Sequence, residues 1–215
     1  MEVIEIIGAP QSVYVRTTRM AFEEKGVAYS LTAAGPNSAR VNALHPFGKI
    51  PVMRHGNFTL FESKAIATYI DRTFEGPALI PQEARSAAIV EQWISAVNTS
   101  IFPTAVIYMQ ANAFPKGPNG QRDEAIVAET IPKLSHYMEV LNNAVGATGY
   151  FAGNAFSLAD MYLMPLLGYL RIFPESRELF ERAEFLLRYF ENHSSRESFV
   201  KTTPPPLNEL RQQPV

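Results

Sequence analysis

A carboxylate and a hydroxyl stand side by side at Glu62 and Ser63, directly before the apolar residues of a predicted helix. The first N–H groups of a helix have no partners inside it, and the helix dipole adds partial positive charge there. We therefore expect Ser63 to receive a ligand carboxylate, while Glu62 suits an ammonium group. Together they predict a site for the end of an α-amino acid. The alternative is that Ser63 is an ordinary N-cap and Glu62 an acid of the first turn.

A predicted β-hairpin leads the chain to this helix start. Val52 and Met53 form a short alternating segment, a turn follows at 55–57, and the apolar-rich run 58–61 resumes as a strand. The second strand ends immediately before Glu62, so the carboxylate stands where the strand becomes the helix.

The residues upstream of the hairpin predict further alternating elements. A strand covers 3–7, a helix spans about 12–25 and ends at Gly26, and a second strand follows at 27–31. A short helical segment is expected near 40–44. With the hairpin and its helix, the order is β-α-β-α-β-β-α.

No convincing strand pattern follows the breaker-rich stretch that begins near Gly76. We therefore expect an α/β domain over residues 1–76, a linker over 77–84 and an all-helical domain over 85–215.

Helical periodicity predicts two long helices in that second part, at 83–113 and 123–145. A Ser-x-x-Asp capping box at 157–160 precedes the apolar run 161–170, which predicts a buried helix with a structural start. At least one more helix is expected over 180–199.

Composition restricts the class of protein. The 215 residues, 47% apolar and 19% charged, are enough to bury a substantial core, and the net charge of -2 lacks the basic excess of a nucleic-acid binder. The chain has no cysteine, and its four histidines show no ligand spacing, so we expect neither disulfides nor a metal. No segment approaches the roughly 18 uncharged apolar residues of a membrane span, and no signal peptide is apparent. We expect a cytoplasmic protein without a nucleic-acid or membrane partner.

Two longer runs resemble a known family. HPFGKIPV at 45–52, followed by Glu62-Ser63 and KAIATYI, resembles the glutathione-binding half of the cytosolic glutathione S-transferase superfamily, whose pattern is N-P-x-G-x-[IV]-P and then E-S-x-A-I. YFAGNAFSLADMYLMP at 150–165 resembles the start of the core helix in the family's all-helical domain. The resemblance implies an α/β thioredoxin-like N-terminal domain (βαβαββα) followed by an all-α helical-bundle C-terminal domain.

The resemblance also implies how glutathione is held. The proline equivalent to Pro51 is cis in the family, and the residue before it, here Ile50, offers its backbone N–H and C=O to the ligand's peptide. Glu62 and Ser63 then bind the γ-glutamyl end.

The glycine end of glutathione has two candidate partners. Plant-type serine enzymes carry a lysine for this carboxylate where the present chain has Asn37. Lys49, just before the expected cis bond, is the first replacement, and Arg40 is the second.

Members of the family stabilise the glutathione thiolate with a Tyr, Ser or Cys near the end of the first strand. Cysteine is absent, which removes the subclasses that form mixed disulfides with glutathione, and the tyrosine classes place their residue where this chain has Ile6 and Ile7. GAPQSVYVRTTRMAFEEKG at 8–26 resembles the serine type, phi-like or a related bacterial class, in which a serine four residues after a glycine opens the first helix. Ser12 is therefore implied as the catalytic residue, although Val13 stands where serine-type members often have proline.

In that role Ser12 donates its hydroxyl hydrogen to the bound sulfur at the positive end of the helix dipole. A hydrogen bond to a charged group, about 1.5–3 kcal/mol, lowers the thiol pKa by roughly one to two units from about 8.5. The alternatives are that Ser12 only caps its helix, or that Tyr14 supplies the hydroxyl. Arg16 is a candidate to bring charge to the sulfur or to a ligand carboxylate, or else an exposed structural arginine.

The implied activity is conjugation of glutathione to a small hydrophobic electrophile, as in detoxification, by a homodimer. In such a dimer the first domain of one subunit packs on the helical domain of the other. The alternative is a non-catalytic glutathione-binding or scaffold protein with the same fold. A second-substrate surface is expected on the helical domain, from residues that at helical spacing are more often core than pocket: Trp93, Phe102, Ile107, Tyr108 and Phe114.

Overall fold

The computed structural model describes residues 2–113, 121–146 and 148–205, which form two compact units. One unit is built from Met1–Ile80 together with Arg196–Val215, and the other from Pro81–Ser195. The division after Ile80 falls inside the stretch expected as a linker. The expected helical domain over 85–215 differs at its C-terminal end, because helix α10 (Glu197–Thr202) groups with the first unit.

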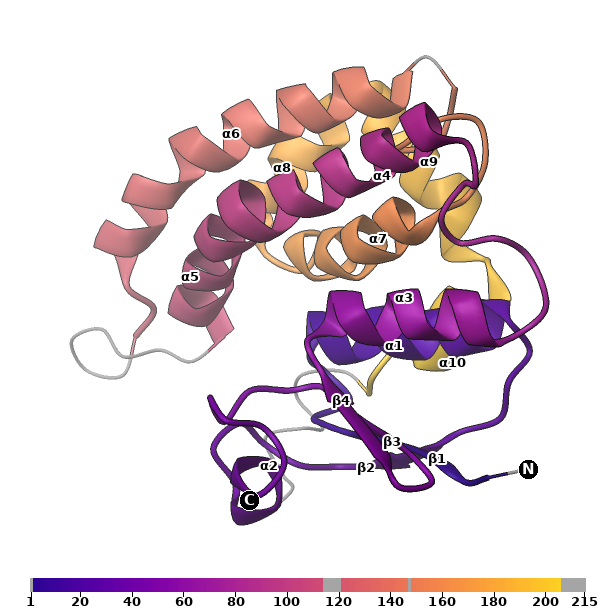
Figure 1. Cartoon of the computed structure of the whole chain (residues 1–215). Coiled ribbons are helices and arrows are strands. Elements are labelled where there is room, and N and C mark those ends of the chain that lie inside the picture. The colour runs from indigo at the N-terminus through magenta and orange to yellow at the C-terminus, as the bar shows by residue number, and fades with distance from the viewer. Residues whose placement is uncertain (1, 114–120, 147, 206–215) are drawn as a thin grey trace. The chain divides into compact units, whose positions relative to one another are not determined.

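The first unit has the predicted order of strands and helices (Figure 1). The second strand is shorter than the predicted 27–31, because the backbone N–H of Val27 donates to the carbonyl of Phe22 at 3.0 Å and still belongs to the end of the first helix. The elements are β1 (Ile4–Ile7), α1 (Val13–Glu24), β2 (Ser30–Thr32), α2 (Ala39–Asn42), β3 (Val52–His55), β4 (Phe58–Phe61) and α3 (Ser63–Thr73).

The described strands form one sheet in the order β2-β1-β3-β4, with β1 parallel to β2 and antiparallel to β3. Side chains alternate between the two faces of a strand. Ile7 therefore shares one face with Glu5, and it packs there with Val41 of α2 and Val52 of β3. Ile4 and Ile6 are buried on the opposite face, where α1 and α3 lie (Figure 1). Helices thus cover both faces of the sheet, so a ligand would be bound at the ends of its strands.

Helix α10 closes the first unit by packing on α1. Arg196, just before α10, donates from Nε and Nη2 to the two carboxylate oxygens of Glu24 at 2.6 and 2.8 Å, and Ser198 also donates to Glu24. At the other end of α10, Arg19 donates to the carbonyl of Lys201 at 3.1 Å. Charged partners on α1 thus hold both ends of this short helix.

The described part of the second unit is helical (Figure 1). The predicted long helix over 83–113 is continuous but carries a π-helical turn, Val97–Ile101, between α4 and α5. The α-helices are α4 (Ala84–Ala96), α5 (Phe102–Ala113), α6 (Glu124–Gly146), α7 (Leu158–Leu170), α8 (Pro174–Arg182) and α9 (Glu184–Ser194).

The predicted capping box starts α7 as expected. Asp160 is fully buried, and its carboxylate accepts from the backbone N–H groups of Ser157 and Phe151 and from the hydroxyls of Ser157 and Tyr189, at 2.8–2.9 Å. Burial raises the pKa of this carboxyl above its ordinary value. The box therefore joins the start of α7 to the preceding loop and to α9.

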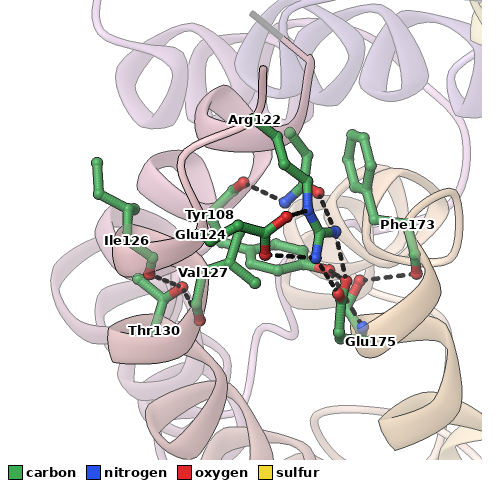
Figure 2. A network of polar contacts seen from close by, with 10 residues as sticks. Tyr108, Arg122, Glu124, Ile126, Val127, Thr130, Phe173 and Glu175 are labelled. Carbon is green, nitrogen blue, oxygen red and sulfur yellow. Dashed lines mark hydrogen bonds and ion pairs between the residues drawn. The ribbon is translucent and has the colours of Figure 1, made fainter. Parts of the chain in front are cut away.

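Arg122 joins the ends of three helices in the same unit (Figure 2). Its guanidinium donates to Glu124 at the start of α6, to Glu175 at the start of α8 and to Asn112 near the end of α5, at 2.6–3.2 Å. Tyr108 also donates to Glu175, at 3.1 Å. These hydrogen bonds to Arg122 lower the pKa values of Glu124 and Glu175. The cluster ties α5, α6 and α8 together.

Candidate functional site

The register of the sheet brings the expected site residues to one end of it. Ile7 pairs with Val52, and Val52 pairs with Phe61, so these three residues form one row across β1, β3 and β4. The residues just beyond that row are Gly8, Pro51 and Glu62. The loop leading to Ser12, the bond between Ile50 and Pro51, and the pair Glu62-Ser63 therefore lie at the same end of the sheet.

The bond between Ile50 and Pro51 is cis, as the resemblance implies. Ile50 packs its side chain against the cluster of Ile7 and Val52. Gly8 leaves room for it, since a Cβ on this glycine would lie 3.3 Å from Cβ of Ile50 and 2.5 Å from Cγ2 of Val15. A side chain at position 8 would push α1 away from the loop that carries the cis bond. The small residue thus keeps the start of α1 and the cis bond together.

Ser12 occupies the N-cap of α1, which is one of the two expected roles. Its Oγ accepts from the backbone N–H of Val15 at 3.4 Å, and its side chain is half-buried. A hydroxyl has one hydrogen to donate besides its acceptor lone pairs. Capping the helix uses a lone pair, so the hydroxyl hydrogen remains available for a ligand atom. The two roles foreseen for Ser12 are compatible.

Glu62 is not an ordinary acid in the first turn of α3, as the alternative interpretation had it. It is itself the N-cap residue of α3, and within the described chain its carboxylate makes no capping hydrogen bond. Its backbone has φ 69° and ψ 114°, a conformation that costs energy in a residue other than glycine. The side chain is 60% exposed. The carboxylate is therefore presented to solvent beside Ser63 at a strained turn, as a ligand-binding group requires.

Two side chains, His45 and Tyr14, lie near Glu62, and the sequence did not indicate either of them as its neighbour. His45 is buried, with Nε2 3.9 Å from Oε1 of Glu62. Burial, and secondarily the charge of Glu62, raises the pKa of Tyr14 well above its ordinary value. Tyr14 therefore stays protonated at neutral pH. The sequence signal that could have placed His45 near the site is its position at the start of the HPFGKIPV run.

The candidates for the glycine end differ in their surroundings. Lys49 is exposed beside the cis bond. Arg40 donates to Glu5 at 2.6 Å, so its charge is already paired. Asn37 adopts φ 60°, and its backbone N–H donates to the carbonyl of Gly48 at 2.8 Å. The loops that carry Asn37 and Lys49 are thus joined at this end of the sheet.

Arg16 is buried, which is contrary to the alternative that it is an exposed structural arginine. It is 2% exposed, Nη2 donates to the hydroxyl of Thr203 at 3.1 Å, and Cζ lies 4.7 Å from the ring centre of Phe199. These contacts give it a structural role in packing α10 on α1. A contact between Arg16 and the ligand stays a prediction.

The residues expected to form a second-substrate surface divide between core and surface. Tyr108 is fully buried and accepts from the backbone N–H of Ser176 at 3.2 Å, so it belongs to the core. Trp93 is half-buried against Phe151, with ring centres 4.6 Å apart. Phe102 is half-buried, and Ile107 is 49% exposed. Phe114 lies outside the described residues.

A cavity of ≈ 600 Å³ lies in the first unit near the C-terminal half of α1, lined in part by Arg19, Glu23, Tyr29, Leu31 and Lys201. Polar side chains of its lining already contact one another: Lys201 lies 3.4 Å from Glu23, and the hydroxyl of Tyr29 donates to Glu23 at 3.0 Å. This cavity shares no lining residue with the group around Ser12 and Glu62.

Across residues 2–113, 121–146 and 148–205, no cluster of acidic, histidine or cysteine side chains is arranged to hold a metal ion. Within the same ranges, no helix combines the length and apolar character needed to cross a membrane.

Comparison with known proteins agrees with this geometry. Residues 6–78 match the model of the glutathione S-transferase N-terminal domain, and residues 104–197 match that of the C-terminal domain. The chain is 30% identical to a glutathione S-transferase of Silene vulgaris over 93% of its own length and 96% of the relative's, and 30% identical to glutathione S-transferase 4 of Zea mays over 74% and 73%. The crystal structure of glutathione transferase F7 from Populus trichocarpa superposes with a TM-score of 0.83 at 27% identity, covering 93% of this chain and 97% of that one.

Proposed function

This chain belongs to the glutathione S-transferase family, and we propose that it binds glutathione at the end of the sheet described above and joins it, through its sulfur, to a small hydrophobic electrophile. The observation that carries the proposal is the row formed by Ile7, Val52 and Phe61. It brings together a hydroxyl, a cis bond in the loop before β3, and an exposed carboxylate. This combination suits a peptide-like ligand with a thiol and an amino-acid end.

Glutathione would lie along the loop of the cis bond. Ile50 would pair its backbone N–H and C=O with the ligand's peptide, in the manner of an added strand. Ser63 at the start of α3 would receive the γ-glutamyl carboxylate, and Glu62 would receive the ammonium group. Lys49 is the best candidate for the glycine carboxylate, because it is exposed beside the cis bond and Arg40 is already paired.

Ser12 would activate the thiol. The capping hydrogen bond uses the Ser12 oxygen as acceptor, so it does not use the hydroxyl hydrogen. Donation to the sulfur would favour the thiolate by about 1.5–3 kcal/mol, and each 1.36 kcal/mol lowers the pKa by about one unit. The thiolate then attacks the electrophilic carbon, a new C–S bond forms, and the leaving group departs with its electron pair. The enzyme contributes sulfur activation and proximity.

We also propose that the protein is a homodimer. Phe47, next to the loop of the cis bond, exposes 70% of its surface, and aromatic side chains are enriched at subunit interfaces.

Binding of glutathione measured by calorimetry tests the proposal, with Glu62→Ala as the variant. Loss of the carboxylate removes the partner of the ammonium group, so the Kd should rise at least about threefold, the effect of one exposed charge-assisted contact. Glu75→Ala, which removes an exposed acid elsewhere in the same unit, is the matched control and should leave the Kd unchanged. Equal affinities for wild type and Glu62→Ala would remove this residue from the site. Turnover of an activated aryl chloride then distinguishes an enzyme from a glutathione-binding protein without activity.

A further inference from the structure

His45 is held rigidly at the turn that precedes the cis bond. Its ring is 2% exposed and packs against the ring of Phe61 at 4.6 Å between centres. Its backbone N–H donates to the carbonyl of Val41 at 2.8 Å, and its own carbonyl accepts from Gly48 at 3.1 Å. The backbone N–H of Phe47 donates to Nδ1 of the ring at 3.1 Å. Neither the backbone nor the ring of His45 can therefore move without disturbing the loop.

These contacts decide which way the ring presents its hydrogen. Nδ1 accepts a hydrogen bond, so the neutral imidazole carries its hydrogen on Nε2. Nε2 lies 3.9 Å from Oε1 of Glu62. The separation is too long for a hydrogen bond but short enough for the N–H dipole to attract a carboxylate.

The carboxylate of Glu62 needs such a partner. It is 60% exposed, and within the described chain it makes no capping bond to its own helix. An exposed glutamate has several rotamers of similar energy, and each ligand it binds must select one of them. A buried, immobile N–H beside one rotamer favours that rotamer before the ligand arrives.

We propose that His45 is a positioning residue that orients the carboxylate of Glu62 toward the ammonium group of glutathione. This rests on the proposed function. His45 stands where the family pattern N-P-x-G-x-[IV]-P has asparagine, so the device belongs to this chain's own sequence. The imidazole links the loop of the cis bond to the start of α3, and it acts on the ligand only through Glu62.

A double-mutant cycle tests this role, with Kd values for glutathione measured by calorimetry. His45→Phe keeps a ring against Phe61 but loses both nitrogens, and it should raise the Kd about three- to tenfold, in the lower part of the range found for coupled neighbours. In the Glu62→Gln background the same substitution should change the Kd by less than about twofold. Glutathione acetylated on its α-amino group has no ammonium to orient, so its affinity should be the same for wild type and His45→Phe.

Matched variants separate positioning from folding. His45→Gln places an N–H close to the position of Nε2 and should restore most of the affinity, whereas His45→Asn, whose amide reaches only the position of Nδ1, should not. His55→Phe removes a histidine of the hairpin, whose Nδ1 lies 2.8 Å from the hydroxyl of Tyr69, and should leave the Kd unchanged. If His45→Phe unfolds, the comparison of the Gln and Asn variants decides the question.

The outcomes are distinct. If His45→Phe leaves the affinity for glutathione unchanged, or weakens it equally with and without Glu62, His45 does not position that carboxylate. His45→Phe should also leave the pKa of the bound thiol where it is in wild type, and a shift would move its role to the sulfur and overturn the proposal. Absence of glutathione binding by the wild type would overturn the proposed function as well.

Discussion

Ser12 caps the start of α1, and the chemistry of a hydroxyl also permits the second role that we propose for it. The oxygen accepts from the backbone N–H of Val15, and the hydrogen is left for the ligand. The cap also orients the side chain, because the accepting bond holds Oγ at the positive end of the helix dipole. A threonine or an alanine at this position would change the cap as well as the site. Experiments on Ser12 must therefore measure folding and catalysis separately.

Replacing Ser12 by alanine tests the proposed role of its hydroxyl. In the proposed site most contacts to glutathione lie elsewhere, so the affinity should stay within a few-fold of wild type, while the pKa of the bound thiol rises. Turnover at neutral pH should fall about ten- to hundredfold, matching roughly 1.4–3 kcal/mol for one charge-assisted hydrogen bond. The thiolate absorbs in the ultraviolet, so a pH titration of the bound complex gives both pKa values directly.

The direction of the pH dependence follows from the thiol. With a raised pKa, a smaller fraction of the bound thiol is ionised at neutral pH, so raising the pH should recover part of the lost turnover. Melting temperatures of both proteins measure the loss of the cap. If the two titrations coincide while Tyr14→Phe or Arg16→Ala shifts the curve, the sulfur is held by one of those residues instead of Ser12.

At the scale of the elements, helix ends are fixed by charged side chains from distant parts of the chain. Asp160 joins α7 to the preceding loop and to α9, and Arg122 joins α5, α6 and α8 (Figure 2). Glu24 of α1 holds the start of α10 through Arg196. In each case one charged group has several partners, so removing it leaves more than one polar group without a partner.

Asp160→Asn tests this arrangement in the second unit. The amide replaces one accepting oxygen by an NH₂ group, which faces donors that are buried with it. The free energy of unfolding should fall by about 2–3 kcal/mol, the cost of leaving buried donors unsatisfied. Urea denaturation measures it, and Glu129→Gln, which removes the exposed partner of Lys133, should cost less than about 0.5 kcal/mol. Similar midpoints for wild type and Asp160→Asn would show that the box contributes little to the stability of the fold.

At the scale of the whole molecule, the chain passes from one unit to the other after Ile80 and returns at Arg196. The first unit is therefore completed by residues from both ends of the sequence. A truncated chain that ends before Arg196 would lack the partners of Glu24 and of Arg16, and its first unit would lose α10.

The proposed homodimer can be tested in solution. Sedimentation velocity at micromolar concentration should show a species of twice the mass of the chain. Phe47→Ser should shift the equilibrium toward the monomer if this exposed ring is buried in the dimer, and Val3→Ser, which alters a residue that is 76% exposed, is the control. A wild-type monomer at that concentration would contradict the proposal. A dimer that withstands Phe47→Ser would place the interface elsewhere.

Features that depend on neighbours along the chain were predictable from the sequence. The hairpin, the helix start at Glu62-Ser63 and the capping box at 157–160 each rest on residues within a few positions of one another, so periodicity and cap chemistry are enough to predict them. The element order of the first unit follows from the same local signals. The resemblance in the 45–70 region then supplied the cis bond, which local patterns do not reveal.

Features that depend on distant partners appeared only in the folded chain. Arg16 is a packing residue because Thr203, 187 positions away, and Phe199 lie against it, and nothing near Arg16 in the sequence indicates this. His45 faces Glu62 because the pairing of β3 with β4 returns the chain to the same end of the sheet. Helical and strand periodicity tell which side of an element is apolar, whereas the identity of the group opposite depends on which elements pack together. Which elements pack together is determined by the burial of the whole core, to which every element contributes.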